Sequence, residues 1–281
     1  MCELIDGKIV AEYIKQQVKT EVESFEHDVA LAVIVIGNDS ASRVYVNNKR
    51  KACGHVGIRS VEYTLPDNIT EGELLLFIDA LNKFQHINGI LIQLPLPKHI
   101  DESKVFERIA PEKDVDGFTA INTGRLWQGK CDLAPCTAMG IIELLNYYNI
   151  DVAGKHCVIV GRSNIVGKPV ASLLLEKDAT VTICHSKTKN LSEITSKADI
   201  LISAVGKPKF ITCDMVKQDS VVIDVGINRD ENGKLCGDVD DESIVNKASM
   251  LTPVPGGVGP MTVAMLMKNT LIAAKNQLAE N

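Results

Sequence analysis

The stretch HCVIVGRSNIVGKPVASLLL, residues 156–175, decides how the second half of this chain folds. Apolar residues lead to Gly161, a turn carries a second glycine at Gly167, and helix-forming residues follow. A continuous apolar run is typical of a strand that is buried on both faces of a parallel sheet. The pattern therefore predicts a strand over 156–160 and a helix over 168–175, joined by a glycine turn.

The same alternation of strands and helices extends in both directions from this stretch. Apolar runs predict further strands over 30–36, 61–65, 89–93, 180–184, 199–204 and 221–225. Helical spacing predicts helices over 8–25, 41–56, 70–84 and 137–147, with a capping box of Thr70 and Glu73 and a long last helix from Pro260. Such alternation predicts an α/β protein with a mainly parallel sheet.

We interpret the 281 residues as two α/β domains. Residues 1–138 form the first domain, and residues 139–259 form the second, a Rossmann-type nucleotide-binding domain. The last helix, 260–281, returns to pack on the first domain. The cleft between two such domains is the expected ligand site.

The composition excludes several classes of function. A net charge of −6 and an aromatic content of 4% argue against nucleic-acid binding. No apolar run is long enough for a membrane span, and the first residues do not resemble a signal peptide, so we expect a cytoplasmic protein. The eight cysteines lack the spacing of a zinc site, so we expect no metal and expect most of them to be buried thiols.

The glycine turn is the candidate site for a dinucleotide. Gly161 and Gly167 allow a pyrophosphate to approach the backbone at a helix N-terminus. The match to the GxGxxG pattern is imperfect, because Ser163 stands where the middle glycine is expected. The context of strand, turn and helix supports the interpretation.

The residues after the strand 180–184 favour NADP over NAD. NAD enzymes usually carry an acidic residue here that binds the ribose 2′-hydroxyl, whereas this chain has His185, Ser186 and Lys187. Arg162, Ser186 and Lys187 would instead bind a 2′-phosphate. The alternative for Arg162 and Lys187 is ordinary surface charge.

Tyr45 and Lys49 lie one turn apart on the predicted helix 41–56, and so on one face. A hydroxyl and an amine held side by side can pass a proton, although a solvated helix face is the common alternative. Short-chain dehydrogenases use the same Tyr-x-x-x-Lys spacing after their glycine turn. Here the pair precedes the turn, which excludes that use.

Six motifs occur in an order that resembles one family over the whole chain. They are YVNNKRKAC at 45–53, GILIQLPLP at 89–97, KDVDG at 113–117, PCT at 135–137, GRS at 161–163 and TPVPGGVGP at 252–260. This set resembles the bifunctional methylenetetrahydrofolate dehydrogenase/methenyltetrahydrofolate cyclohydrolases. The resemblance extends to where the two-domain enzymes end, so we expect no formyltetrahydrofolate synthetase extension.

The resemblance implies NADP-dependent oxidation of 5,10-methylenetetrahydrofolate, followed by hydrolysis of the 5,10-methenyl product to 10-formyltetrahydrofolate. It also implies a homodimer and a role in one-carbon metabolism that supplies purine, methionine and histidine biosynthesis. The implied catalytic residues are Lys49, Tyr45 and Gln93. The implied substrate-binding residues are Tyr45, Asp116, Gly257 and Pro260, and the implied cofactor-binding residues are Gly161, Arg162, Ser163, Ser186 and Ile227.

The chemistry of the two steps divides the roles of these residues. Hydride loss leaves a cation that two neighbouring nitrogens stabilise, so that step needs positioning rather than a base. Hydrolysis needs a proton acceptor, and a cationic substrate in a partly dry cleft disfavours the ammonium form of Lys49. Gln93 would hold Lys49 through a neutral amide oxygen; its alternative role is to bind loop backbone.

Asp116 suits the aminopyrimidine edge of a folate, because a carboxylate accepts two parallel N–H bonds. The alternative is an Asx turn before Gly117. Two other functions stay open: a dehydrogenase without hydrolase activity, and a non-catalytic regulator that binds NADP or folate.

Overall fold

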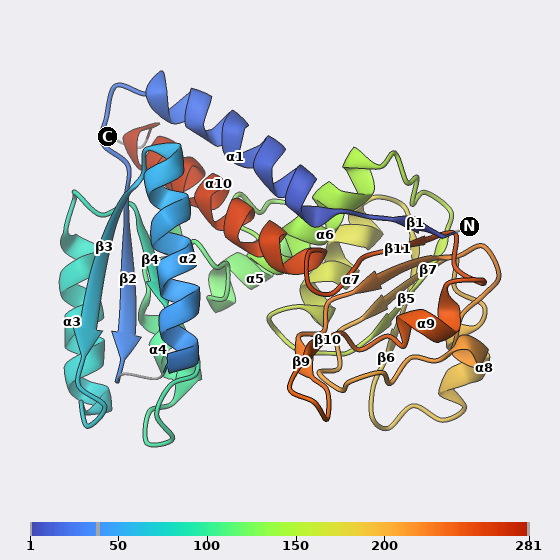
Figure 1. Cartoon of the computed structure of the whole chain (residues 1–281). Coiled ribbons are helices and arrows are strands. Elements are labelled where there is room, and N and C mark those ends of the chain that lie inside the picture. The colour runs from blue at the N-terminus through green and yellow to red at the C-terminus, as the bar shows by residue number, and fades with distance from the viewer. Residues whose placement is uncertain (1, 38–39, 280–281) are drawn as a thin grey trace. The chain divides into compact units, whose positions relative to one another are not determined.

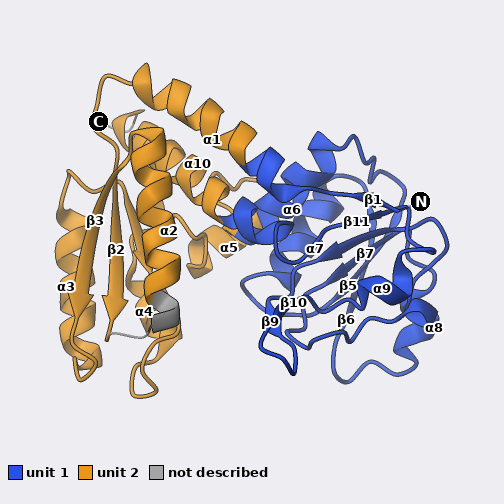
Figure 2. Cartoon of the chain, viewed as in Figure 1, with its two compact units in different colours: residues 1–11, 137–262 blue, residues 12–136, 263–281 orange. Residues whose placement is uncertain are grey.

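The computed structural model describes residues 2–37 and 40–279, with the backbone alone for 40–42 (Figure 1). The chain forms two compact units (Figure 2). Unit 1 consists of residues 1–11 and 137–262, and unit 2 consists of residues 12–136 and 263–281. Residues 1–11 therefore belong with unit 1 and not with the first domain as we predicted it.

Unit 1 is built on a six-stranded, all-parallel sheet with the order β1-β11-β8-β7-β5-β6. The strands are β1 (Glu3–Leu4), β5 (His156–Val160), β6 (Thr180–Cys184), β7 (Ile200–Ser203), β8 (Val221–Asp224) and β11 (Met250–Leu251). Pairing of β1 with β11 explains why the N-terminal residues join this unit. The strand order reverses between β5 and β7, and ligands of such sheets bind at the carboxyl ends of the strands at this point.

Short elements surround the sheet of unit 1. They are α6 (Cys136–Tyr147), α7 (Gly167–Glu176), α8 (Leu191–Thr195), α9 (Asp241–Ile244), the 3₁₀ turn η2 (Cys213–Met215) and the antiparallel pair β9 (Asn228–Arg229) and β10 (Leu235–Cys236). Val158, Leu201 and Val222 from three neighbouring strands are fully buried in the core of this unit. The Rossmann-type fold predicted for this part of the chain is confirmed.

Unit 2 contains a parallel sheet with the order β3-β2-β4. Its strands are β2 (Ala30–Ile36), β3 (Arg59–Leu65) and β4 (Gly89–Ile92), and its helices are α2 (Ser40–Val56), α3 (Glu71–Lys83), α4 (Glu102–Arg108) and α5 (Ala120–Trp127), with a 3₁₀ turn η1 (Pro111–Lys113). Every residue of β2 is buried, as its unbroken apolar run predicts. The predicted capping box of Thr70 and Glu73 is formed.

Helices α1 (Gly7–Glu23) and α10 (Val258–Ala279) each contribute several residues to both units, and α6 contributes its first residue, Cys136, to unit 2. The part of α10 in unit 2 packs on the first half of the chain, as predicted: Lys275 pairs with Glu21, and Gln277 Nε2 donates to the carbonyl of Asn88 at 2.8 Å. The helix begins at Val258, which puts Pro260 in its first turn.

Four of the eight cysteines are buried, so the prediction that most are core residues was too broad: Cys53, Cys136, Cys157 and Cys184 are buried and Cys213 is exposed. Burial raises the pKa of Cys53 to about 11 and that of Cys157 to about 12.

Across residues 2–37 and 40–279, no helix has both the length and the hydropathy that a bilayer crossing demands.

Candidate functional site

Lys49 and Gln93 meet in unit 2 through a direct hydrogen bond. Lys49 lies on α2, and its Nζ donates to Oε1 of Gln93 at 3.0 Å. Gln93 directly follows β4 and continues its pairing, because its N–H donates to the carbonyl of Ile34 at 2.9 Å. Its Nε2 donates to the carbonyl of Leu94 at 2.8 Å, which turns the amide oxygen toward the lysine. The Gln93 amide therefore both binds Lys49 and binds loop backbone, which are the two roles that the sequence left open.

Tyr45 lies one turn before Lys49 on α2, and 47% of its surface is exposed. Between these two described side chains the structure shows no hydrogen bond. An exposed phenol on the same helix is available to a ligand. The role of Tyr45 stays a prediction.

The turn before α5 depends on Asp114 and not on Asp116. Asp114 is buried, and its carboxylate accepts hydrogen bonds from the backbone N–H groups of Phe118 at 3.1 Å and Thr119 at 2.8 Å. It also accepts from Asn122 Nδ2 at 3.0 Å. Because Asp114 supplies this turn, the alternative of an Asx role for Asp116 loses its support.

Asp116 is half-buried and lies in the electrostatic field of its neighbours. Burial raises the pKa of its carboxyl to about 6; the positive charge of Lys49 opposes the rise, and the negative charge of Asp114 adds to it. The structure thus brings Asp116 within the field of Lys49, which in turn contacts Gln93. These three predicted residues form one cluster in unit 2.

The Cys136 thiol also belongs to this cluster. Burial raises its pKa well above the usual range, so the thiol is neutral at physiological pH. Its Sγ donates to the carbonyl of Val115 at 3.3 Å. Cys136 therefore packs and donates, and it is not an activated nucleophile.

Asn269 on α10 is a residue of this site that our sequence analysis missed. Its side chain is buried, and Nδ2 donates to the carbonyls of Val115 at 2.8 Å and Ala134 at 2.9 Å. It thereby ties the residue before Asp116 to the segment before Cys136. The signal that could have found it is a lone amide among the apolar residues of a long helix, because buried polar groups need partners.

The glycine turn of unit 1 has the geometry of a nucleotide cradle. Gly161 has φ +141°, and a Cβ there would overlap the carbonyl oxygen of Ala204. A Cβ on Gly167 would overlap the carbonyl oxygen of Gly161. Ser163 Oγ accepts from the N–H groups of Val166 at 3.1 Å and Gly167 at 3.3 Å, and so satisfies backbone donors at the start of α7, where the N-cap residue Val166 has no side-chain cap of its own. These bonds give Ser163 a structural role, and its contact with a cofactor stays a prediction.

Arg162 and Ser186 lie at the same edge of the unit 1 sheet. Arg162 follows β5 and Ser186 follows β6, and these strands pair up to Val160 and Cys184 at their carboxyl ends. Both side chains are exposed. This placement fits the anion site predicted from the sequence.

The remaining predicted residues of unit 1 gather near the start of α10. Ile227 is 52% exposed, and a Cβ on Gly259 would lie 3.8 Å from its Cδ1. Gly257 is buried, where a Cβ would lie 2.7 Å from the carbonyl oxygen of Pro253, and Pro260 is half-buried. The contacts predicted for these residues with substrate or cofactor stay predictions.

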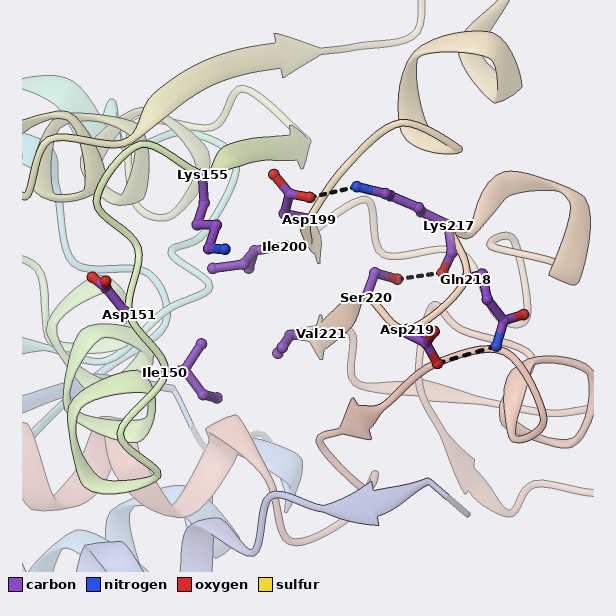
Figure 3. Close-up of a pocket in the computed structure, with 10 residues that line it drawn as sticks. All are labelled: Ile150, Asp151, Lys155, Asp199, Ile200, Lys217, Gln218, Asp219, Ser220 and Val221. Carbon is purple, nitrogen blue, oxygen red and sulfur yellow. Dashed lines mark hydrogen bonds and ion pairs between the residues drawn. The ribbon is translucent and has the colours of Figure 1, made fainter.

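A pocket of about 180 Å³ lies in unit 1 at the opposite edge of the sheet, beside the amino ends of β7 and β8 (Figure 3). Lys155, Asp199 and Ser220 are among its lining residues, and Lys217 Nζ pairs with Asp199 at 2.5 Å. The glycine turn is at the carboxyl ends of the strands. This pocket is therefore not the predicted nucleotide site.

Comparison with known proteins identifies the family. Residues 5–116 match the catalytic domain of tetrahydrofolate dehydrogenase/cyclohydrolase, and residues 135–278 match its NAD(P)-binding domain. The chain belongs to the tetrahydrofolate dehydrogenase/cyclohydrolase family. It is 56% identical to the bifunctional protein FolD of Campylobacter hominis over 98% of both chains, and 56% identical to that of Acetivibrio thermocellus over 98% of this chain and 97% of the relative.

Solved structures of this family have the same fold. FolD from Campylobacter jejuni superposes with a TM-score of 0.95 at 48% identity, covering 99% of this chain and 100% of that one. FolD from Trypanosoma brucei, solved with NADP cofactor and an inhibitor, has a TM-score of 0.92 at 37% identity, covering 99% of this chain and 98% of that one.

Proposed function

We propose that this chain is a bifunctional enzyme of folate interconversion. It oxidises 5,10-methylenetetrahydrofolate to the 5,10-methenyl form with NADP, and it then hydrolyses that product to 10-formyltetrahydrofolate. Membership of the family supports both reactions. The observation that carries the second reaction is the hydrogen bond from Lys49 to the neutral amide of Gln93.

In the oxidation step, the residues of the chain bind and orient. The carbon that loses the hydride lies between two nitrogens whose lone pairs stabilise the cation, so the step needs no general base. NADP, when bound, accepts the hydride. We assign the Asp116 carboxylate to the aminopyrimidine edge of the folate, where it accepts two parallel N–H bonds. We assign Tyr45 to the folate ring or to orienting Lys49.

In the hydrolysis step, Lys49 moves a proton. Water adds to the methenyl carbon and gives one proton to Lys49. The new hydroxyl then loses its proton as its oxygen forms the formyl carbonyl, the bond from that carbon to N5 breaks, and N5 takes up a proton. One proton is released to solvent overall. Lys49 and the Asp116 carboxylate lie within each other's electrostatic field. Gln93 fixes the direction of Nζ without adding a second negative charge.

The residues of unit 1 fit a dinucleotide with a 2′-phosphate. A Cβ at Gly161 or Gly167 would overlap a backbone carbonyl of the protein itself, so both glycines serve the tight turn from β5 into α7. That turn brings a helix N-terminus to the proposed pyrophosphate site. The segment after β6 carries Ser186 and Lys187 and no acid, and Arg162 lies at the same edge. We assign Gly161, Arg162, Ser163, Ser186 and Ile227 to the cofactor, and Gly257 and Pro260 to the substrate.

The cofactor preference is open to direct measurement. We expect kcat/KM for NADP to exceed that for NAD, because Arg162 and Ser186 bind a 2′-phosphate and no carboxylate follows β6 to bind a 2′-hydroxyl. Steady-state oxidation with each nucleotide gives the two values. A larger kcat/KM with NAD would contradict the assignment.

Gln93→Glu tests the value of a neutral partner for Lys49. The new carboxylate would stabilise the Lys49 ammonium, so we expect hydrolysis to fall about tenfold or more at neutral pH and to recover toward alkaline pH. Oxidation should change far less. The pH profile of methenyl hydrolysis measures this, and Gln85→Glu, at an exposed position of unit 2, is the matched control. An unshifted profile in Gln93→Glu would refute the role of the neutral amide.

The two other functions that the sequence left open lose their support. A dehydrogenase without hydrolase activity would not need the Lys49–Gln93 hydrogen bond. A non-catalytic regulator would not need the cluster of Lys49, Gln93 and Asp116. We further propose a homodimer in the cytoplasm that supplies one-carbon units to purine, methionine and histidine biosynthesis, as the family resemblance implies.

One coupled assay tests the proposed function. The purified chain receives 5,10-methylenetetrahydrofolate and NADP while the NADPH and methenyl absorbance bands are followed together. The proposal predicts NADPH formation with little methenyl build-up. If NADPH forms but the methenyl product disappears only at its spontaneous rate, the chain is a dehydrogenase without hydrolase activity. If no NADPH forms, the chain fits the non-catalytic regulator.

A further inference from the structure

Asp238 is a fully buried carboxylate in unit 1 that gathers hydrogen-bond donors from several segments. Its Oδ2 accepts from Ser203 Oγ at 3.2 Å, from the Val205 N–H at 2.7 Å and from the Gly206 N–H at 3.3 Å. These donors belong to the last residue of β7 and to the loop that follows it. A charged acceptor with several donors holds such a loop in one conformation.

The other oxygen of Asp238 reaches a second segment. Oδ1 accepts from the Lys207 N–H at 2.9 Å and from Asn228 Nδ2 at 2.9 Å. Asn228 begins β9 and directly follows Ile227, one of the predicted cofactor residues. A Cβ on Gly226 would overlap the Asp238 carboxylate, so that backbone also lies against it. One side chain thus joins the segment after β7 to the segment after β8.

A second buried carboxylate, Asp224, holds Asp238 in place. Asp224 is the last residue of β8, and Oδ1 accepts from the N–H groups of Gly226 and Asp238, each at 2.9 Å. Its Oδ2 accepts from the Val239 N–H at 2.9 Å. The Asp238 backbone is therefore anchored to the end of a central strand.

The loop after β7 is also a wall of the glycine turn. Its first residue, Ala204, donates its N–H to the carbonyl of Val160 at 2.9 Å. The Ala204 carbonyl is the group that a Cβ on Gly161 would overlap. Movement of the loop 204–207 would therefore change the cradle at Gly161, at the point where the strand order reverses.

We propose that Asp238 is a positioning residue for the nicotinamide dinucleotide. It acts through the loop 204–207 and the Ile227–Asn228 segment, which it fixes beside the glycine turn. This inference rests on the proposed function, because it takes the cofactor to lie at the carboxyl ends of β5, β7 and β8. Asp238 itself is fully buried, so it acts through these segments and not by touching the cofactor.

The test removes single contacts of Asp238 and leaves the carboxylate in place. Asn228→Ala deletes one donor, and Ser203→Ala deletes another. We expect each variant to raise the KM for NADP by about 5- to 20-fold, with kcat and the KM for methylene-folate within twofold of wild type. Asp238→Asn should raise the KM for NADP further. Hydrolysis of added methenyl-folate without nucleotide should stay unchanged, because Lys49, Gln93 and Asp116 lie in unit 2.

The controls separate this inference from the proposed function. Asn232→Ala, an exposed asparagine between β9 and β10, should leave the KM for NADP unchanged. Calorimetric titration with NADP measures the affinity for the cofactor directly. Weaker NADP binding in Asn228→Ala and Ser203→Ala supports the inference, and unchanged binding in both variants overturns it. Parallel loss of hydrolysis and oxidation would also overturn it, since that indicates general destabilisation. A wild-type chain that binds NADP but oxidises no folate would defeat the proposed function alone.

Discussion

Replacing Lys49 by methionine is expected to slow hydrolysis of the methenyl substrate by about 10²- to 10⁴-fold, the usual contribution of general acid–base catalysis. Oxidation should fall by less than about tenfold, because that step needs no proton acceptor. Methionine keeps most of the length of the side chain and removes the amine that contacts Gln93. Separate assays of methenyl hydrolysis and of NADPH formation measure the two rates.

The matched control for this substitution lies on the same helix. Lys51 is exposed on α2, and Lys51→Met removes an equal charge two residues away. We expect both activities of that variant to stay near those of wild type. Equal loss of both activities in Lys49→Met would refute the assignment of Lys49 to hydrolysis and not to oxidation.

Replacing Asp116 by alanine is expected to raise the KM for folate by about 10- to 100-fold in both reactions. The magnitude is that of losing charge-assisted hydrogen bonds to the aminopyrimidine edge. The effect should appear in both steps because the same pterin is held in each. Asp132→Ala, at an exposed position of unit 2, is the matched control. An unchanged KM for folate in Asp116→Ala would count against the pterin contact.

The pH dependence of folate binding provides a second readout for Asp116. Burial raises the pKa of its carboxyl to about 6, above its usual value near 4. The folded state therefore binds this proton more tightly than the unfolded state, and the stability that Asp116 contributes is present below about pH 4 and is lost as the pH rises through about 6. Folate affinity should show the opposite pH dependence: it should fall below about pH 6, because the carboxylate is then protonated. Asp116→Asn should remove both dependences.

Local patterns in the sequence were enough for the main strands and helices. The apolar runs of 30–36 and 157–160 predicted β2 and β5, because burial on both faces leaves no polar positions within a run; His156, the first residue of β5, is only partly buried. The short strands β1 and β11 were missed, since two residues carry no periodicity. Their pairing joins residues 3–4 to 250–251, a contact between distant parts of the chain. The position of residues 1–11 was wrong for this reason.

The residues of the candidate site came from the family resemblance. Lys49 and Gln93 are far apart in sequence, and the resemblance placed both at one site; the argument for a neutral acceptor beside the lysine then agrees with the hydrogen bond between them. The motif at 113–117 contains two aspartates, and spacing alone could not assign the turn to Asp114. Asn269 lies in a different part of the chain, and its contacts with Val115 and Ala134 arise only from tertiary packing.

The central claim is that Lys49 serves hydrolysis and not hydride transfer. The most direct test supplies Lys49→Met with 5,10-methylenetetrahydrofolate and NADP in one cuvette and follows NADPH and the methenyl product together. We predict that NADPH forms at a rate within about tenfold of wild type, while methenyl-folate accumulates in a ratio of about one to one with it. NADPH formation that falls as far as hydrolysis, with no accumulation of the methenyl product, would contradict the claim.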